Sequence, residues 1–183
     1  MIGISEYGLC LGKSSRTVEE IAGAFCPPDE LISMHEIGLE RICTANEVSI
    51  DNMIYEAFDK IKEKPDIIFI AHSLPFIMSN GYEIMPYIHR IPVLCLSGLP
   101  CVILHRAVMT AVKMISAKSY RSILVIGADK AYSDRERIFF GTIMGDSAVA
   151  LLIRDNSEHN HILSSHVATH IIAPRGENSN NDD

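Results

Sequence analysis

The hydrophobic residues of this chain fall into continuous runs and helical stripes, and the two patterns predict different elements. Residues 67–71 form a continuous β-branched and aromatic run, which is typical of a strand buried on both faces. The run at 91–96 is expected to be a short buried strand. Apolar runs also predict strands at 2–9, 123–127, 148–153 and, with more exposure, 161–169.

Helical spacing of apolar residues is clearest over residues 50–62, where they recur at i, i+3, i+4, i+7, i+8 and i+11. This pattern predicts one amphipathic helix with a single buried stripe. Ser49 is its expected N-terminal cap, and Pro65 follows its end. Thr17 is the expected cap of an earlier helix, which residues 26–29 interrupt with two prolines.

A third helix, over residues 101–117, is apolar around most of its circumference. A helix of this kind must be buried on all sides. This excludes an outer helix of a two-layer domain and indicates a central helix between two sheets. Strands and helices alternate along the chain, which predicts an α/β fold whose sheet has parallel members joined by right-handed crossovers.

Length and composition indicate one globular domain. The chain has 183 residues, of which 48% are hydrophobic and 21% charged, so it can bury a core of its own. Residues 1–173 are expected to form this domain, and residues 174–183 a polar tail or the start of a connection. No apolar run reaches the roughly 18 residues that span a bilayer, and no signal peptide is visible. The five cysteines include no Cys-x-x-Cys pair, which favours reduced thiols and a cytoplasmic protein.

The formal net charge of −7 argues against a nucleic-acid partner. An acidic carrier protein would need local positive charge instead. The best candidates are Lys113, Lys118 and Arg121 around one helix end, with Arg135 and Arg137. The alternative is that these residues belong to an ordinary solvated surface.

Cys101 is the candidate nucleophile because the chain places it between a sharp turn at 97–100 and the first turn of the apolar helix. Unpaired N–H groups and the helix dipole favour a thiolate there, by up to about 2 kcal/mol. The alternative is a small buried hydrophobic residue, since free cysteine is often buried. Cys95, inside the preceding strand, is expected to belong to the core.

Two further positions carry weaker signals. Asp146, in the turn at 145–147, is expected to accept backbone N–H bonds, and Gly145 to allow close packing. His72 ends the third strand, where it is either a helper in catalysis or a structural histidine. The only histidine cluster, at 159–170, does not match the spacing of a compact zinc site, so no metal is expected.

Taken in order, these segments resemble the N-terminal half of the ketoacyl synthase III branch of the thiolase superfamily. The resemblance rests on the segments 29–32 (Asp-Glu-Leu-Ile), 38–41 (Gly-Leu-Glu-Arg), 66–73, 120–127 and 141–153, together with Cys101. It implies a thiolase-like half domain, with a mixed five-stranded sheet and a buried central helix. It also implies an acyltransferase or condensing enzyme whose cysteine takes an acyl group from a thioester and passes it to a second substrate.

The chain departs from the family pattern in ways that bear on substrates and partners. Pro100 lies in a loop one residue longer than usual, and Ser147 replaces a glycine. The tryptophan and arginine that clamp the adenine of CoA in the family are here Leu31 and His35. This implies weaker use of CoA, an acyl group presented on an acyl carrier protein, and a role in specialised metabolism. No separate cofactor is implied.

The family's catalytic His and Asn belong to a second half that these residues do not contain. The resemblance therefore implies a partner half of the fold, in cis or as a separate chain, and a homo- or heterodimer. The expected dimer joins through the loop after the third strand and the strand before Cys101, which makes one continuous sheet across a two-fold axis. The rival prediction is a non-catalytic thiolase-fold partner that stabilises an active synthase.

Overall fold

A computed structural model describes residues 1–73, 90–98, 102–139 and 141–166 of the chain. Its centre is a five-stranded sheet in the order β1-β9-β6-β4-β5. Strand β4 is parallel to β5 and β6, whereas β9 is antiparallel to β6 and β1. The predicted mixed five-stranded sheet is thereby confirmed. The strands are β1 (Gly3–Leu11), β4 (Ile67–Ala71), β5 (Val93–Leu96), β6 (Ser122–Asp129) and β9 (Ser147–Arg154).

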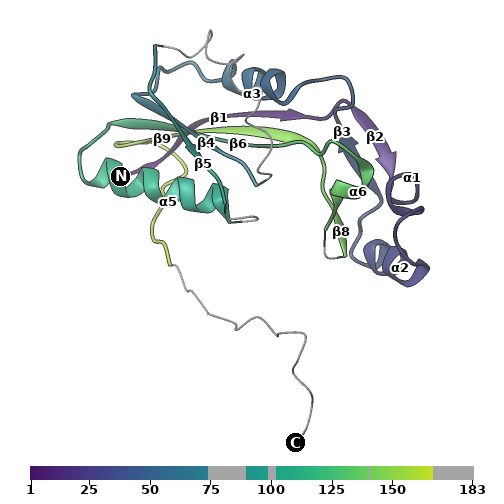
Figure 1. Ribbon diagram of the computed structural model, residues 1–183. Coiled ribbons are helices and arrows are strands. Elements are labelled where there is room, and N and C mark those ends of the chain that lie inside the picture. Colours follow the sequence, from purple (N-terminus) through teal and green to yellow (C-terminus); the bar gives the residue numbers. More distant parts are fainter. Residues whose placement is uncertain (74–89, 99–101, 140, 167–183) are drawn as a thin grey trace, which may run out of the picture.

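One long helix covers each face of this sheet (Figure 1). Helix α3 (Ile50–Phe58) packs its apolar stripe on one face, and α5 (Ile103–Ser116) packs on the other. The predicted cap of α3 is confirmed, because the Asn52 N–H donates to Ser49 Oγ at 3.2 Å. The helix ends at Phe58, earlier than the expected residue 62.

Helix α5 differs from its prediction in its surroundings. Only Ile103, Ala107, Ala111 and Ile115 are buried, and these residues form one stripe against the sheet. The expected burial on all sides is therefore wrong for the described residues. The reason is that they contain one layer against α5, the sheet, and no second layer over its outer face.

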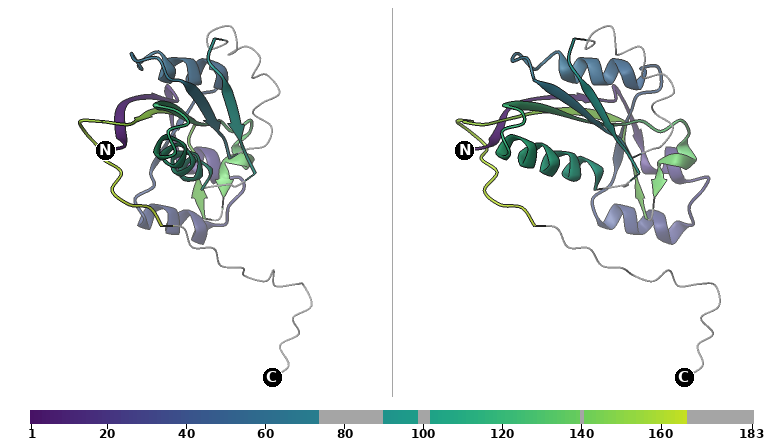
Figure 2. Two further views of the ribbon diagram at one scale, coloured as in Figure 1. Left: turned by 90° about the vertical axis from the view of Figure 1, so that its left-hand side faces the viewer. Right: turned by 60° about the vertical axis from the view of Figure 1, so that its left-hand side comes forward.

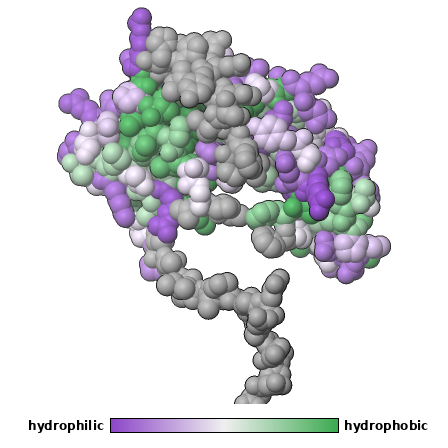
Figure 3. All heavy atoms as spheres, viewed as in Figure 1, coloured by the Kyte–Doolittle hydropathy of each residue, from purple (hydrophilic) through white to green (hydrophobic). Residues whose placement is uncertain are grey.

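Strand β5 forms an edge of the sheet, so the expectation of a buried strand at 91–96 is also wrong. Among the described residues its only strand neighbour is β4. Leu94 is 42% exposed and Cys95 is exposed, so Cys95 does not belong to the core. Figure 3 shows hydrophobic residues gathered on the surface over this part of the sheet.

The C-terminal strand expected at 161–169 does not form within the described residues. His161 makes one isolated bridge to Gly3, and residues 162–166 have no regular structure. The remaining positions of that prediction and the expected tail at 174–183 lie outside the described residues.

A smaller unit lies at one end of the sheet, on the right in Figure 1, and Figure 2 shows the same arrangement from two further directions. It has a core of its own, which includes Val18, Ile21, Met34, Ile42 and Ile143. The predicted cap at Thr17 is confirmed as a reciprocal capping box with Glu20. Its elements are β2 (Ser14–Thr17), α1 (Val18–Ala22), α2 (Pro28–Glu36), β3 (Arg41–Thr44), α6 (Asp134–Arg137), β7 (Ile138–Phe139) and β8 (Thr142–Ile143).

Candidate active site

A pocket of about 200 Å³ opens where β4 and β6 end and α5 begins. The carboxyl ends of parallel strands are where open α/β sheets bind ligands. The pocket walls are mostly apolar, and its polar residues are Ser73, Asp129 and Ser147. The apolar and small residues that line it are Ala71, Ile103, Leu104, Gly127, Ala128 and Val149.

Gly127 of β6 faces the Leu104 side chain at the start of α5. A Cβ at this position would lie 2.9 Å from Leu104 Cδ1, so the glycine leaves room for this leucine side chain beside the pocket. The helix begins after Val102, which makes no side-chain cap. Among the described residues, no side chain of the N-cap position therefore caps the first-turn N–H groups of α5, which start beside the pocket.

The loop after β4 is tied to the end of β6 at the pocket. The Ser73 N–H donates to Asp129 Oδ1 at 2.8 Å. His72, just before it, is only 4% exposed, and its backbone N–H donates to the carbonyl oxygen of Leu96 at 3.2 Å. His72 does not line the pocket, so the geometry favours the structural alternative for this residue.

Cys101 and Pro100 lie outside the described residues, and the role of Cys101 stays a prediction. The described part of α5 begins immediately after this position and contributes Ile103 and Leu104 to the pocket. The other four cysteines are free thiols. Burial raises the pKa of the Cys10 thiol, which suits a core residue and not a nucleophile.

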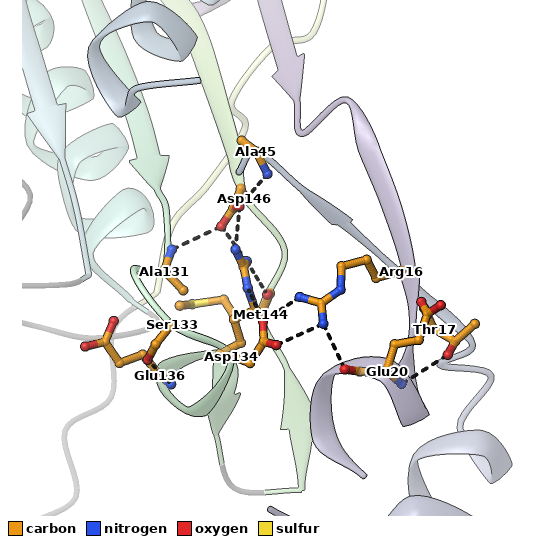
Figure 4. A network of polar contacts seen from close by, with 11 residues as sticks. Arg16, Thr17, Glu20, Ala45, Ala131, Ser133, Asp134, Glu136, Met144 and Asp146 are labelled. Carbon is orange, nitrogen blue, oxygen red and sulfur yellow. Dashed lines mark hydrogen bonds and ion pairs between the residues drawn. The ribbon is translucent and has the colours of Figure 1, made fainter. Parts of the chain in front are cut away.

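Asp146 anchors a buried polar network between the sheet and the smaller unit (Figure 4). Its carboxylate accepts the backbone N–H groups of Ala45 at 2.6 Å and Ala131 at 3.0 Å, which confirms the predicted role. Gly145 allows the close packing expected of it, since a Cβ there would lie 3.3 Å from the carbonyl oxygen of Cys43.

The main partner of Asp146 was not predicted from the sequence. Arg137 binds it through two hydrogen bonds, of 2.5 and 2.7 Å, and both side chains are buried. The expectation that Arg137 belongs to a surface basic patch is therefore wrong. Asp134 lies between Arg137 and Arg16 and binds Arg16 at 2.6 and 2.9 Å. The Arg16 hydrogen bonds hold the pKa of Asp134 below its usual range.

The two positions of the family's adenine clamp are engaged in other contacts. Leu31 packs against the core of the smaller unit. His35 Nε2 lies 2.5 Å from Glu19 Oε1. Residues 18–40 contain several acidic residues and no Lys or Arg, so this surface offers little to a phosphorylated ligand.

The described part of the chain contains neither a candidate metal site nor a candidate membrane span. No three His, Cys, Asp or Glu side chains there are grouped so that they could hold a metal ion. No helix there is long and apolar enough to cross a bilayer.

Comparisons with known proteins agree with this fold. Residues 100–170 match the family model of 3-oxoacyl-(acyl-carrier-protein) synthase III. The synthase III structure from Aquifex aeolicus VF5 superimposes with a TM-score of 0.67 at 20% identity, over 86% of this chain and 55% of that one. The synthase III of Pseudomonas aeruginosa PAO1 gives 0.65 at 14% identity, over 84% and 51%.

A priming β-ketosynthase from the R1128 polyketide biosynthetic pathway gives a TM-score of 0.66 at 12% identity, over 86% of this chain and 51% of that one. No curated protein matches the sequence. The predicted thiolase-like fold and the predicted resemblance to the synthase III branch are confirmed as a likeness to these structures, and the chain spans about half of their length.

Proposed function

We propose that this chain is the nucleophile-bearing half of a condensing acyltransferase, with Cys101 as its nucleophile. The observation that carries the proposal is the pocket at the carboxyl ends of β4 and β6, next to the start of α5. The family match over residues 100–170 includes Cys101 and all of helix α5. In the cytoplasm, the thiols of such an enzyme stay reduced.

The proposed reaction has two steps. The Cys101 thiolate attacks the carbonyl carbon of an acyl thioester, the carbonyl–sulfur bond of the donor breaks, and the donor leaves as a thiol after protonation. A carbon or heteroatom nucleophile then takes the acyl group from Cys101 and releases its sulfur. Splitting the transfer in this way replaces one difficult step with two easier ones.

The described residues would position the acyl group and its carbonyl oxygen. The apolar walls formed by Ile103, Leu104 and Val149 suit an acyl chain. The uncapped first turn of α5 offers N–H groups of the kind that stabilise an oxyanion. The tie between Ser73 and Asp129 fixes the loop beside them.

Two further surfaces fit a partner that supplies the other half of the site. Helix α5 carries the half-buried residues Val108 and Val112 beside its buried stripe, and a second layer would cover the part of them that is exposed. The edge of β5, with Leu94 exposed, is open for pairing with another strand. In this proposal a homo- or heterodimer forms at β5, and the catalytic His and Asn come from the second half.

The first test is intact-mass labelling of the chain, purified with any co-expressed partner, by a short acyl-pantetheine thioester and by iodoacetamide at neutral pH. A thiol whose pKa is lowered by about 1.5 units reacts roughly tenfold faster at neutral pH than an ordinary one. We expect one acyl group per chain, which Cys101→Ala abolishes.

Cys95→Ala is the matched control, because Cys95 is an exposed thiol on the preceding strand. This variant should lose one site of slow alkylation and keep the acyl transfer. Slow acylation scattered over several cysteines, unchanged by Cys101→Ala, would contradict the enzyme proposal. That result would favour the rival function, a non-catalytic partner that stabilises an active synthase.

The nature of the donor gives a second prediction. Because Leu31 and His35 are engaged elsewhere and residues 18–40 are acidic, the nucleotide part of CoA should contribute little to the reaction. We expect acyl-CoA and the matching acyl-pantetheine to acylate Cys101 at rates within about threefold of each other, or about 0.7 kcal/mol. A 100-fold preference for acyl-CoA would contradict weak CoA use.

A further inference from the structure

A second pocket, of about 500 Å³, lies at the opposite end of the sheet from the candidate active site. It is formed by residues at the start of β4 and β6, the end of β9 and the turn after α5. Strand β6 runs from Ser122 in this pocket to Asp129 in the candidate active site. A strand of this length spans roughly 20 Å, so the two pockets are separate sites.

Basic residues are concentrated in this second pocket although the chain as a whole is acidic. The net charge is −7, and the chain has only 16 Lys and Arg residues. Four of them line the pocket, namely Lys64, Lys118, Arg121 and Arg154. This places a quarter of the basic side chains of the protein around one cavity.

The carboxylates of the pocket are each held by groups of the protein. Glu63 pairs with Arg154, and Asp155 Oδ2 lies 2.6 Å from Lys118 Nζ. The hydrogen bond from Lys118 holds the pKa of Asp155 below its usual range.

Asp66 also lines this pocket, and its carboxylate accepts hydrogen bonds from the backbone. Its Oδ2 accepts the N–H groups of Arg121 at 2.8 Å and Ser122 at 3.0 Å. Each of the three carboxylates is thus engaged by a group other than the side chains of Lys64 and Arg121.

The side chains of Lys64 and Arg121 differ from the other basic side chains of the pocket in this respect. Neither Lys64 nor Arg121 forms an ion pair with a carboxylate among the described residues. A guanidinium presents a planar fork of donors that matches a phosphate group, and an ammonium adds a compact charge. The cavity is larger than a phosphate ion and falls within the range of small-molecule sites.

We propose that this pocket binds a small phosphate monoester, with Arg121 and Lys64 on its phosphate group. The site goes beyond the proposed acyl transfer and does not depend on Cys101. It also gives Arg121 a role other than carrier-protein docking, for which the sequence made it a candidate beside the alternative of a solvated surface. A concave pocket admits a small anion, and its position at the far end of β6 does not suit delivery of an acyl group to the candidate active site.

The test is isothermal titration calorimetry of the full chain with glycerol 3-phosphate, inorganic phosphate and acetate, at one fixed ionic strength because salt screens such contacts. We expect saturable binding of both phosphate probes, with glycerol 3-phosphate at least as tight as inorganic phosphate, and none of acetate. The double variant Lys64→Gln with Arg121→Gln should bind at least tenfold more weakly. Both residues are exposed, so this variant should unfold at the wild-type urea concentration.

The control is the double variant Lys13→Gln with Arg41→Gln, which removes the same charge from exposed positions outside the pocket. It should change the affinity less than twofold. Equal weakening by both double variants would reduce the binding to general electrostatics and overturn the proposal. So would the absence of saturable binding, an equal affinity for acetate, or a monoester that binds tenfold more weakly than inorganic phosphate.

Discussion

Gly8→Ala should destabilise the protein by about 3 kcal/mol, the upper part of the range for overpacked interiors. Gly8 lies in β1 directly beneath α3. A Cβ built there would be closer than 3.0 Å to the carbonyl oxygen of Ala57, a separation that real Cβ atoms essentially never show. The obstacle is helix backbone, so no side-chain rotation relieves it. Either α3 or β1 must shift, and the cluster of buried residues between them must open.

Urea unfolding of Gly8→Ala and Gly38→Ala would separate this clash from backbone strain. Gly38 has a φ of +81° and no atom within 4 Å of an added Cβ. Its substitution therefore carries only the left-handed conformational cost of about 1–2 kcal/mol. The expected result is a clearly larger drop in the free energy of unfolding for Gly8→Ala, at a similar m-value. Equal losses would show that α3 moves off β1 at little cost.

The central strands of the sheet could be predicted because both of their faces are buried. The run at 67–71 coincides with β4, whose five residues are all buried. The run at 91–96 contains similarly apolar residues, yet β5 is an edge strand with exposed residues. Hydrophobicity alone does not distinguish a central strand from an edge strand, because it does not specify the neighbours of the strand in the sheet.

The same limit applies to α5. Its apolar residues around most of the circumference predict two covering layers, and the described residues supply one. This mismatch and the coverage of about half of the synthase III structures point the same way. In the proposed function, a partner half supplies the second layer that this pattern predicts.

In the polar network, the acceptor role of Asp146 was predictable from the sequence, but its donors were not, because they lie 101 and 15 residues away along the chain. Asp146 in a small-residue turn signals acceptance of N–H bonds, and this role is confirmed. Its partner Arg137 is of a residue type that is usually found on the surface. The hairpin of β7 and β8 brings it back over the turn. A charged residue flanked by an apolar hairpin, with Ile138 on one strand and Ile143 on the other, is the signal that could have revealed it.

Asp146→Ala should cost about 3–5 kcal/mol, the range for removing one partner of a buried ion pair. The substitution leaves the buried Arg137 guanidinium without its bidentate partner and removes the acceptor of the Ala45 and Ala131 N–H groups. Arg137→Met should cost less, because Asp146 keeps both backbone hydrogen bonds and the apolar side chain fills part of the space. Urea denaturation of both variants gives this ranking directly.

The double variant Asp146→Ala with Arg137→Met then isolates the pair. If the cost of Asp146→Ala comes mainly from an uncompensated buried charge, removing that charge recovers part of it, and the double variant is more stable than the sum of the two losses predicts. Strict additivity would mean that the two backbone N–H groups, and not the guanidinium, account for the loss. Arg16→Gln is the matched control, since it removes an outer member of the same network that lies 27% exposed in its side chain. Its loss should stay near 1 kcal/mol, as for a partly exposed ion pair.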